Sequence, residues 1–385
     1  MDGLAYFDNA ATTYPKPAAV YDYADRFYRD SGGNIGRGGN ALAIKAGNIA
    51  KQAKENLLTL FDCPNRQVVF TSSATDALNR ILLGLDIQDN DVICVTPFEH
   101  NAVTRILRHL EDTRCVRIKV LPFDRVSLLP DTAQIESLFT ENKPKLIIAN
   151  HASNVCGAVV PVEQICSLAK SLTDATTVID MSQTAGLLDA ELSKSVIDYA
   201  VFAGHKTLYA PLGIGGFVCK QDATLKPVFF GGNGIDSIQQ EMPEDLIPME
   251  EIGSQNTYAI AGLKAATDWI LELSVDEIRR REYNNVDKLI SLLENYEDIH
   301  IVANKMKCER IGVVSCLFDD YSPDEAEMLL GKFGIAVRSG IQCAPYAHEF
   351  LGTLPAGTVR FSVSALTDDS DFTHLQNALE KMCVY

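Results

Sequence analysis

The chain has 385 residues, of which 46% are hydrophobic and 22% charged, and its formal net charge is −17. This balance is typical of a globular protein large enough for more than one domain. A surface this acidic repels phosphate backbones and anionic lipids, so neither nucleic acid nor a membrane is an expected partner.

The first residues contain no basic region followed by an apolar core, and no apolar stretch approaches the ~20 residues of a membrane span. Ten cysteines are scattered along the chain without a C-x-x-C pair. This pattern predicts reduced thiols in a cytoplasmic protein. Nine of the ten are expected in the core, and Cys343 is the exception.

The first two-thirds of the chain alternate short β-rich runs with longer amphipathic segments. The predicted strands show little alternation of polar and apolar residues, as expected when helices cover both faces of a sheet. They span residues 67–70, 91–95, 116–121, 145–149, 176–179, 199–203 and 215–219, and helices are predicted at 74–85, 101–110 and 162–171. This order favours a mainly parallel α/β domain.

The pattern changes after about Asn256. A long helical region is predicted at 258–294, followed by a strand at 311–318, a helix from Pro323 and short strands at 335–338 and 358–363. A last helix begins near residue 368. We therefore expect a smaller α+β domain at the C-terminal end.

The segments that follow the strands are the first candidates for a site, because ligands of open α/β sheets gather beyond the carboxyl ends of strands. In Thr71-Ser72-Ser73-Ala74-Thr75-Asp76, small hydroxyl residues precede a helix, which suits a phosphate. An ordinary helix N-cap explains the same residues.

Two further segments carry charged residues at strand ends. Asp180 ends a strand, where a buried carboxylate needs a cation such as a protonated pyridine nitrogen, although a helix cap or a structural ion pair explains it equally well. Lys206 follows another strand, in Gly204-His205-Lys206. Burial there would lower the pKa of its amine and so leave the nucleophilic lone pair free. His100 follows a third strand and could stack on an aromatic ring or remain structural.

Taken together, these segments resemble the class V aminotransferase family of pyridoxal-phosphate enzymes, and within it the cysteine desulfurases. The matching motifs occur in the family's order through most of the chain. They are Asp8-Asn9-Ala10-Ala11-Thr12-Thr13, Glu99-His100, His151-Ala152-Ser153-Asn154-Val155-Cys156-Gly157, Asp180-Met181-Ser182-Gln183, Gly204-His205-Lys206 and Glu251-Ile252-Gly253-Ser254-Gln255-Asn256.

The resemblance implies a fold type I, aspartate aminotransferase-like architecture with a mainly parallel seven-stranded large domain and a homodimer. It implies an N-terminal segment at 1–18 packing with the small domain, a large domain at 19–257 and a small domain at 258–385. Lys206 would form the Schiff base, and His100 would stack on the cofactor and move protons. The other cofactor contacts implied are Ser73, Ala74, Thr75, Asn154, Asp180, Gln183, His205 and, for the neighbouring subunit's phosphate, Gly253 and Ser254. No metal is expected.

The C-terminal part is similar to the desulfurase segment A-V-R-x-G-x-x-C-A, which here reads Ala336-Val337-Arg338-Ser339-Gly340-Ile341-Gln342-Cys343-Ala344. The resemblance implies that Cys343 accepts sulfur from L-cysteine as a persulfide and that alanine is released. It also implies substrate contacts from Arg360, Arg338, Asn154 and Ala10, and a possible sulfur-acceptor protein. A small buried thiol is the alternative reading of Cys343.

Several positions depart from the family pattern. Ala74 and Ala203 stand where many relatives carry Thr and Ser, Gly36 and Asn40 replace histidines, and the segment 344–355 is longer. Selenocysteine lyase and a small-substrate aminotransferase therefore remain alternatives, as does a scaffold without catalysis. No G-x-G-x-x-G follows the first strands, which argues against a nicotinamide dehydrogenase.

Overall fold

In the computed structural model, the described residues are 3–35, 39–189, 192, 196–232, 234 and 238–382. All seven predicted strands of the first part form one sheet in the order β2-β8-β7-β6-β5-β3-β4, and only β8 runs antiparallel to its neighbours. The strands are β2 (Arg66–Thr71), β3 (Val92–Val95), β4 (Arg117–Val120), β5 (Leu146–Asn150), β6 (Thr176–Asp180), β7 (Tyr199–Ala203) and β8 (Gly215–Lys220). The predicted α/β fold is confirmed.

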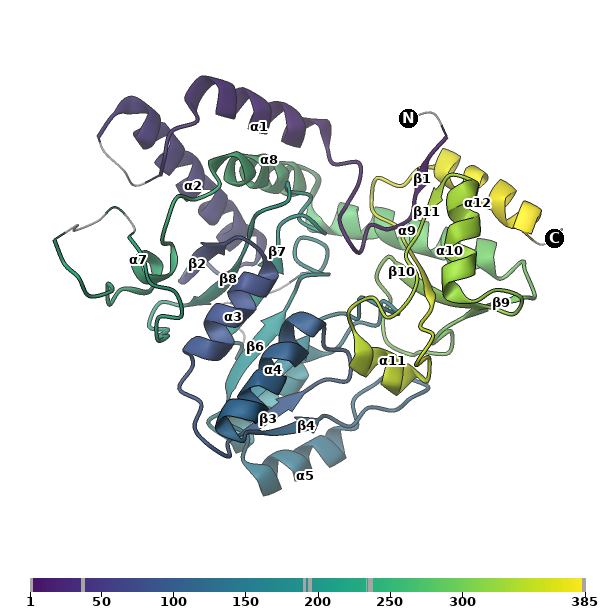
Figure 1. Ribbon diagram of the computed structural model, residues 1–385, viewed down its shortest axis with the longest axis horizontal. Helices are drawn as coiled ribbons and strands as arrows, with labels where there is room; N and C mark the ends of the chain where they lie inside the picture. The colour runs from purple at the N-terminus through teal and green to yellow at the C-terminus, as the bar shows by residue number, and fades with distance from the viewer. Residues whose placement is uncertain are drawn as a thin grey trace.

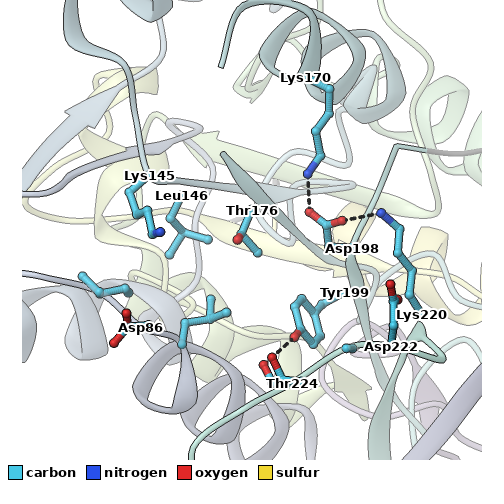
Figure 2. A pocket seen from close by; sticks show the side chains of 13 residues that line it. Asp86, Lys145, Leu146, Lys170, Thr176, Asp198, Tyr199, Lys220, Asp222 and Thr224 are labelled. Atoms are coloured by element: carbon cyan, nitrogen blue, oxygen red, sulfur yellow. Dashed lines mark hydrogen bonds and ion pairs between the residues drawn. The ribbon is translucent and has the colours of Figure 1, made fainter. Parts of the chain in front are cut away.

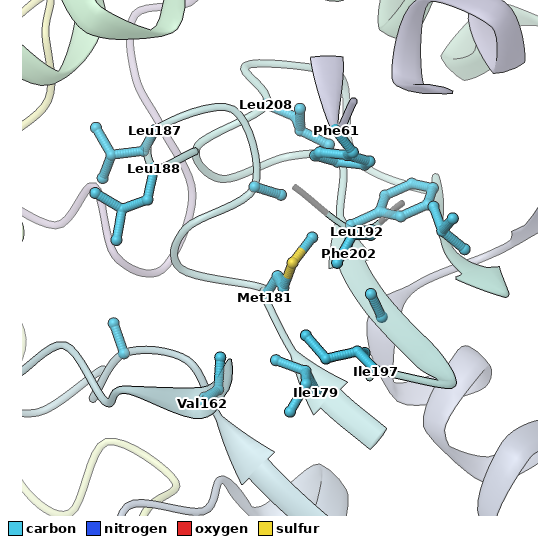
Figure 3. Close-up of a cluster of buried hydrophobic side chains, with 14 of the residues drawn as sticks. Phe61, Val162, Ile179, Met181, Leu187, Leu188, Leu192, Ile197, Phe202 and Leu208 are labelled. Atoms are coloured by element: carbon cyan, nitrogen blue, oxygen red, sulfur yellow. The ribbon is translucent and has the colours of Figure 1, made fainter. Parts of the chain in front are cut away.

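Helices cover both faces of this sheet, as the weak polar alternation predicted (Figure 1). Successive side chains of a strand point to opposite faces. Accordingly Val178 and Val201 pack in one core cluster with α3 (Ala74–Gly84) and α4 (Asn101–Arg114). Ile179 and Phe202 pack on the other face, where Figure 3 shows them with Met181 and Phe61. The remaining helices around the sheet are α1 (Ala18–Ser31), α2 (Ala41–Leu60), α5 (Thr132–Asn142), α6 (Val162–Leu172), α7 (Leu246–Glu250) and α8 (Thr257–Leu273).

The C-terminal part has its own core and a three-stranded antiparallel sheet in the order β12-β10-β9. Its elements are α9 (Val275–Leu293), β9 (Ile299–Ile301), β10 (Val313–Phe318), α10 (Pro323–Lys332), β11 (Ile335–Ala336), α11 (Pro345–Leu351), β12 (Val359–Ser362) and α12 (Asp369–Met382). Strand β1 (Ala5–Tyr6) pairs in parallel with β11, so the N-terminal segment lies against this part (Figure 1). The boundaries at residues 18 and 257 stay a prediction.

Two sequence-based expectations need correction. The helical region at 258–294 is not continuous, because Ser274 has φ +76° and its side chain accepts a hydrogen bond from the Glu277 amide, which ends α8 and starts α9. Cys115 is exposed rather than in the core, because it caps α4 in the left-handed region. Cys308 is only half-buried, and Gly36 and Cys383 lie outside the described residues. Across the part of the chain that the structure describes, no helix is long and apolar enough to cross a membrane.

Candidate active site

A cavity of about 380 Å³ opens beyond the carboxyl ends of β5, β6 and β7, and it also receives residues from the C-terminal part. Thirteen of the fifteen predicted site residues line it. They are Ala10, Ser73, Ala74, Thr75, His100, Asn154, Asp180, Gln183, His205, Lys206, Arg338, Cys343 and Arg360. The fold thus gathers most of the predicted side chains around one cavity.

Lys206 stands on a tight turn after β7. Gly204 allows this turn, because a Cβ there would lie 2.8 Å from the Ile214 side chain and carbonyl. The Lys206 carbonyl accepts hydrogen bonds from the Thr13 hydroxyl at 2.7 Å and from the Tyr209 amide at 2.8 Å, which fixes the backbone. Burial lowers the pKa of the Lys206 amine to about 8, with Asp180 opposing the shift. About a tenth of this amine is therefore neutral and nucleophilic at pH 7, far more than for an ordinary lysine.

Asp180 ends β6 with its carboxylate facing the same cavity. One carboxylate oxygen, Oδ1, accepts hydrogen bonds from the Ser182 amide at 2.9 Å and the Ser182 hydroxyl at 2.5 Å. Ser182 was not predicted, although it lies inside the quoted Asp180–Gln183 motif. The side-chain amide of Gln183 donates to the Ala10 carbonyl at 2.9 Å, which joins the N-terminal segment to the site.

His100 is the N-cap of α4, and its Nδ1 accepts a hydrogen bond from the Ala102 amide at 3.0 Å. Burial and the neighbouring Lys206 lower the pKa of His100 to about 4. The imidazole is therefore neutral, with its proton on Nε2. Its neighbour Glu99 is fully buried, and burial raises the pKa of Glu99 to about 8. Glu99 Oε1 accepts from the Asn150 amide at 2.9 Å, which ties this turn to the end of β5.

The Ser73–Thr75 segment forms the first turn of α3. The Ser73 hydroxyl caps the helix by accepting from the Asp76 amide at 3.2 Å, so the N-cap reading is correct, and the turn also lines the cavity. Strand β8 supports it closely: a Cβ at Gly215 would lie 2.7 Å from the Ala74 nitrogen. The N-terminal amides of the helix and the partial positive charge of its terminus suit an anionic group.

Two arginines enter from the C-terminal part and share Asp8, a residue that opens one of the quoted motifs but was not predicted as a contact. Arg360 is 2% exposed and donates to Asp8 Oδ1 at 2.6 Å and to the Asn154 carbonyl at 3.0 Å. Arg338 contacts the other Asp8 oxygen at 3.2 Å. Arg360 Nε and Asn154 Oδ1 are buried without a hydrogen-bond partner. A ligand that bonds both atoms would remove the free-energy cost of leaving them unpaired.

Cys343 is exposed and follows Gln342 in a turn where both residues have positive φ, +42° and +58°. Its carbonyl accepts from the Asn101 amide at 2.7 Å, so the turn rests on the N-terminus of α4. The preceding residue is also anchored, because the Asn154 side chain donates to the Gln342 carbonyl at 2.8 Å. The alternative reading of Cys343 as a buried core thiol is wrong.

Gly253 and Ser254 do not join this cavity. Ser254 lines a separate cavity with Thr71, Asp76 and Arg80, and Gly253 has φ +78° in the turn beside it. A single protomer therefore does not bring this segment to the Lys206 cavity.

Another cavity of about 380 Å³ lies at the opposite, amino-terminal ends of β5, β6 and β7 (Figure 2). Figure 2 shows Asp198 between two lysines, with Lys170 at 2.6 Å and Lys220 at 2.7 Å. The same carboxylate forms ion pairs with both cations, and none of the described residues that line the cavity is a cysteine or a histidine. Its side chains lack the nucleophile and proton carrier that the Lys206 cavity provides.

Comparison with known proteins agrees with this geometry. Residues 5–375 match the family described as Aminotransferase class-V. A probable cysteine desulfurase of Aeropyrum pernix is 30% identical, covering 99% of this chain and 94% of its own length. One of Methanothermobacter thermautotrophicus is 26% identical over 98% of this chain and 94% of its length. The apo structure of a cysteine desulfurase from Thermococcus onnurineus NA1 is 26% identical, with a TM-score of 0.89 over 98% of this chain and 94% of that one. The chain therefore belongs to the class-V aminotransferase family.

Proposed function

We propose that this protein is a pyridoxal-phosphate-dependent cysteine desulfurase that converts L-cysteine to L-alanine and transfers the sulfur to Cys343 as a persulfide. One observation carries the proposal: an amine of lowered pKa at Lys206 and an exposed thiol at Cys343 line the same cavity. The names of the relatives support the same reaction.

The residues of the cavity fit the cofactor. Lys206 would bind its aldehyde carbon, Asp180 its pyridine nitrogen and the Ser73–Thr75 turn its phosphate, while neutral His100 would stack on the ring. His205, Asn154 and Gln183 would complete the surroundings. When bound, pyridoxal phosphate supplies an electron sink for a deprotonated substrate carbon. The protein's own task is to orient the ring, fix the protonation of its nitrogen and exclude water.

Arg360 would bind the substrate carboxylate, because its buried Nε has no partner and a guanidinium offers parallel donors to a carboxylate. Arg338, Asn154 and Ala10 lie beside it in the cavity. The Lys206 amine, once displaced by substrate, would accept the α-proton. His100 would carry protons at Nε2.

Cys343 would attack the substrate sulfur as a thiolate, as in thiol–disulfide exchange. A sulfur–sulfur bond forms on Cys343 while the bond between sulfur and the β-carbon breaks. The electron pair of that bond stays on the carbon, which takes up a proton and becomes the methyl group of alanine. Atoms and electrons balance without an external oxidant.

The active form would be a homodimer in which Gly253 and Ser254 of one subunit reach the cofactor phosphate of the other, since they lie outside the Lys206 cavity of their own chain. A sulfur-acceptor protein would remove the persulfide sulfur. A cytoplasmic location would suit the nine described cysteines, none of which is in a disulfide.

Alanine release tests the reaction and separates the alternatives. The holoenzyme should release alanine from cysteine with dithiothreitol and without any α-keto acid, and the Cys343→Ser variant should not. A strict need for an α-keto acid would identify an aminotransferase instead. Release from selenocysteine but not from cysteine would identify a selenocysteine lyase.

A further inference from the structure

A buried network of polar side chains lies directly behind Cys343. Gln342 is 6% exposed and His348, in α11, is fully buried. His348 Nε2 lies 2.8 Å from Gln342 Oε1, and His348 Nδ1 lies 2.7 Å from the Thr353 hydroxyl. The Gln342 side-chain amide donates to the Thr358 carbonyl at 2.9 Å. The longer segment at 344–355 thus supplies the imidazole and its partner at Nδ1, Thr353, while Gln342 lies just before it.

The donors and acceptors of this network are consistent with a neutral imidazole at His348. Gln342 Nε2 donates to a carbonyl, so Gln342 Oε1 is the acceptor and His348 Nε2 must carry a proton. In a neutral imidazole with this proton, Nδ1 accepts from the Thr353 hydroxyl. Burial agrees, because it lowers the pKa of His348 to about 4. Every polar atom of the Gln342 side chain is thereby bonded.

This anchoring matters because the Cys343 turn is unfavourable by itself. Two successive non-glycine residues with positive φ persist only where surrounding contacts impose that conformation. The Gln342 carbonyl accepts from Asn154, whose own carbonyl accepts from Arg360. The turn that bears the thiol is therefore held at two points, by Asn154 at the Gln342 carbonyl and by His348 at the Gln342 side chain.

We propose that His348, acting through Gln342, is a positioning residue that holds the Cys343 turn in the geometry needed for sulfur transfer. This inference rests on the proposed function, in which Cys343 is the sulfur acceptor. His348 touches neither substrate nor cofactor. It affects only the position of the Cys343 thiol. A misplaced nucleophile lowers the rate of the chemical step without weakening substrate binding.

Two amide substitutions distinguish the hydrogen bond at His348 Nε2 from the one at Nδ1. Glutamine places its amide near Nε2, so His348→Gln retains a donor to Gln342. Asparagine reaches only the Nδ1 position, so His348→Asn retains a partner for Thr353 and loses that donor. Thr353→Val, which alters only the far end of the network, is a milder third variant. Each holoenzyme is assayed for kcat and KM with cysteine, for cofactor absorption, and for the rate at which iodoacetamide alkylates Cys343.

His348→Asn should lower kcat at least about tenfold with KM and cofactor absorption unchanged, and it should change the alkylation rate of Cys343 several-fold. His348→Gln should stay within about twofold of the wild type, and Thr353→Val should lie between the two. Wild-type kcat and alkylation in both His348→Asn and Thr353→Val would overturn the proposal. Equal losses in the asparagine and glutamine variants would also overturn it, because the bond to Gln342 would then not be the cause.

The same measurements distinguish failure of this inference from failure of the proposed function. If the wild type releases no alanine from cysteine, the proposed function is wrong, and the alkylation rates still report whether His348 orders the turn. If the wild type is active and the asparagine variant is equally active, only the positioning role is wrong.

Discussion

The protonation of single side chains determines when this site is reactive. Lys206 and Asp180 lie in the same cavity, yet burial outweighs the carboxylate and leaves the amine with a pKa of about 8. The neutral imidazole of His100 adds no competing positive charge at neutral pH. Among the described residues that line the cavity, Asp180 is the one carboxylate, and it shares the cavity with this nucleophilic amine.

Cofactor loading should follow the protonation of Lys206. Only the neutral amine attacks an aldehyde, so the loading rate of apoprotein should rise about tenfold per pH unit below pH 8 and level off above it. The rate is measured by stopped-flow absorption after mixing with pyridoxal phosphate between pH 6 and pH 9.5. Lys206→Ala, the control, should develop no protein-bound visible band. A wild-type rate still rising steeply beyond pH 9 would show that the amine is not shifted.

Substituting Arg360 should impair substrate binding more than substituting Arg338. Arg360→Lys keeps a cation for Asp8 but loses the Nε donor, so KM for cysteine should rise tenfold or more. Arg338 has a side chain 46% exposed, and Arg338→Lys should change KM only about twofold. Steady-state alanine release measures both. Equal effects of the two substitutions would contradict the role assigned to Arg360.

At the scale of helices and strands, much of the architecture could be predicted from the sequence. The strand from Tyr199 to Ala203 has the predicted ends, because apolar side chains buried on both faces leave a clear signal. The break at Ser274 was not foreseen, because the helical pattern continues on both sides of it. The contacts of α11 were also unpredictable, since the pairing of His348 with Gln342 depends on how the segment folds back.

Glu282, in helix α9, should make the free energy of unfolding depend on pH. Glu282 is 4% exposed, and its Oε1 accepts from the Gly312 amide at 2.9 Å. Burial raises the pKa of Glu282 from 4.5 to about 7. Between these values the folded protein keeps a proton that the unfolded chain releases, so the free energy of unfolding falls as pH rises, by roughly 3 kcal/mol in total.

Glu282→Gln removes this titration and retains an acceptor for Gly312. Relative to the wild type, the variant should therefore gain stability between pH 5 and pH 7.5, as measured by urea unfolding at both pH values. A difference between variant and wild type that stays constant across this range would show that Glu282 is already ionised in the folded protein.

At the scale of the whole molecule, the fold brings together residues from both ends of the chain. Asp8 bridges Arg338 and Arg360, and the Cys343 turn rests on α4. The sequence motifs indicated which residues to consider, and their order indicated the family. Asp8 was missed as a contact because its partners lie more than 300 positions away in the chain.

If the site is shared between subunits, two inactive variants should complement each other. Gly253→Val strains a turn of positive φ, and Lys206→Ala removes the amine. Co-expressed in equal amounts, the two chains should form mixed dimers in half of the cases, each with one intact site of two. About one quarter of the wild-type activity should return. Activity no higher than that of the separate variants would exclude a shared site.

Sulfur transfer to Cys343 is tested most directly by incubating the holoenzyme with L-cysteine in the absence of reductant and locating the added sulfur by peptide mass spectrometry. One additional sulfur atom is expected on Cys343, absent when Lys206 is replaced by alanine. Sulfur on a different cysteine, or none on the protein while alanine is released, would contradict transfer to Cys343.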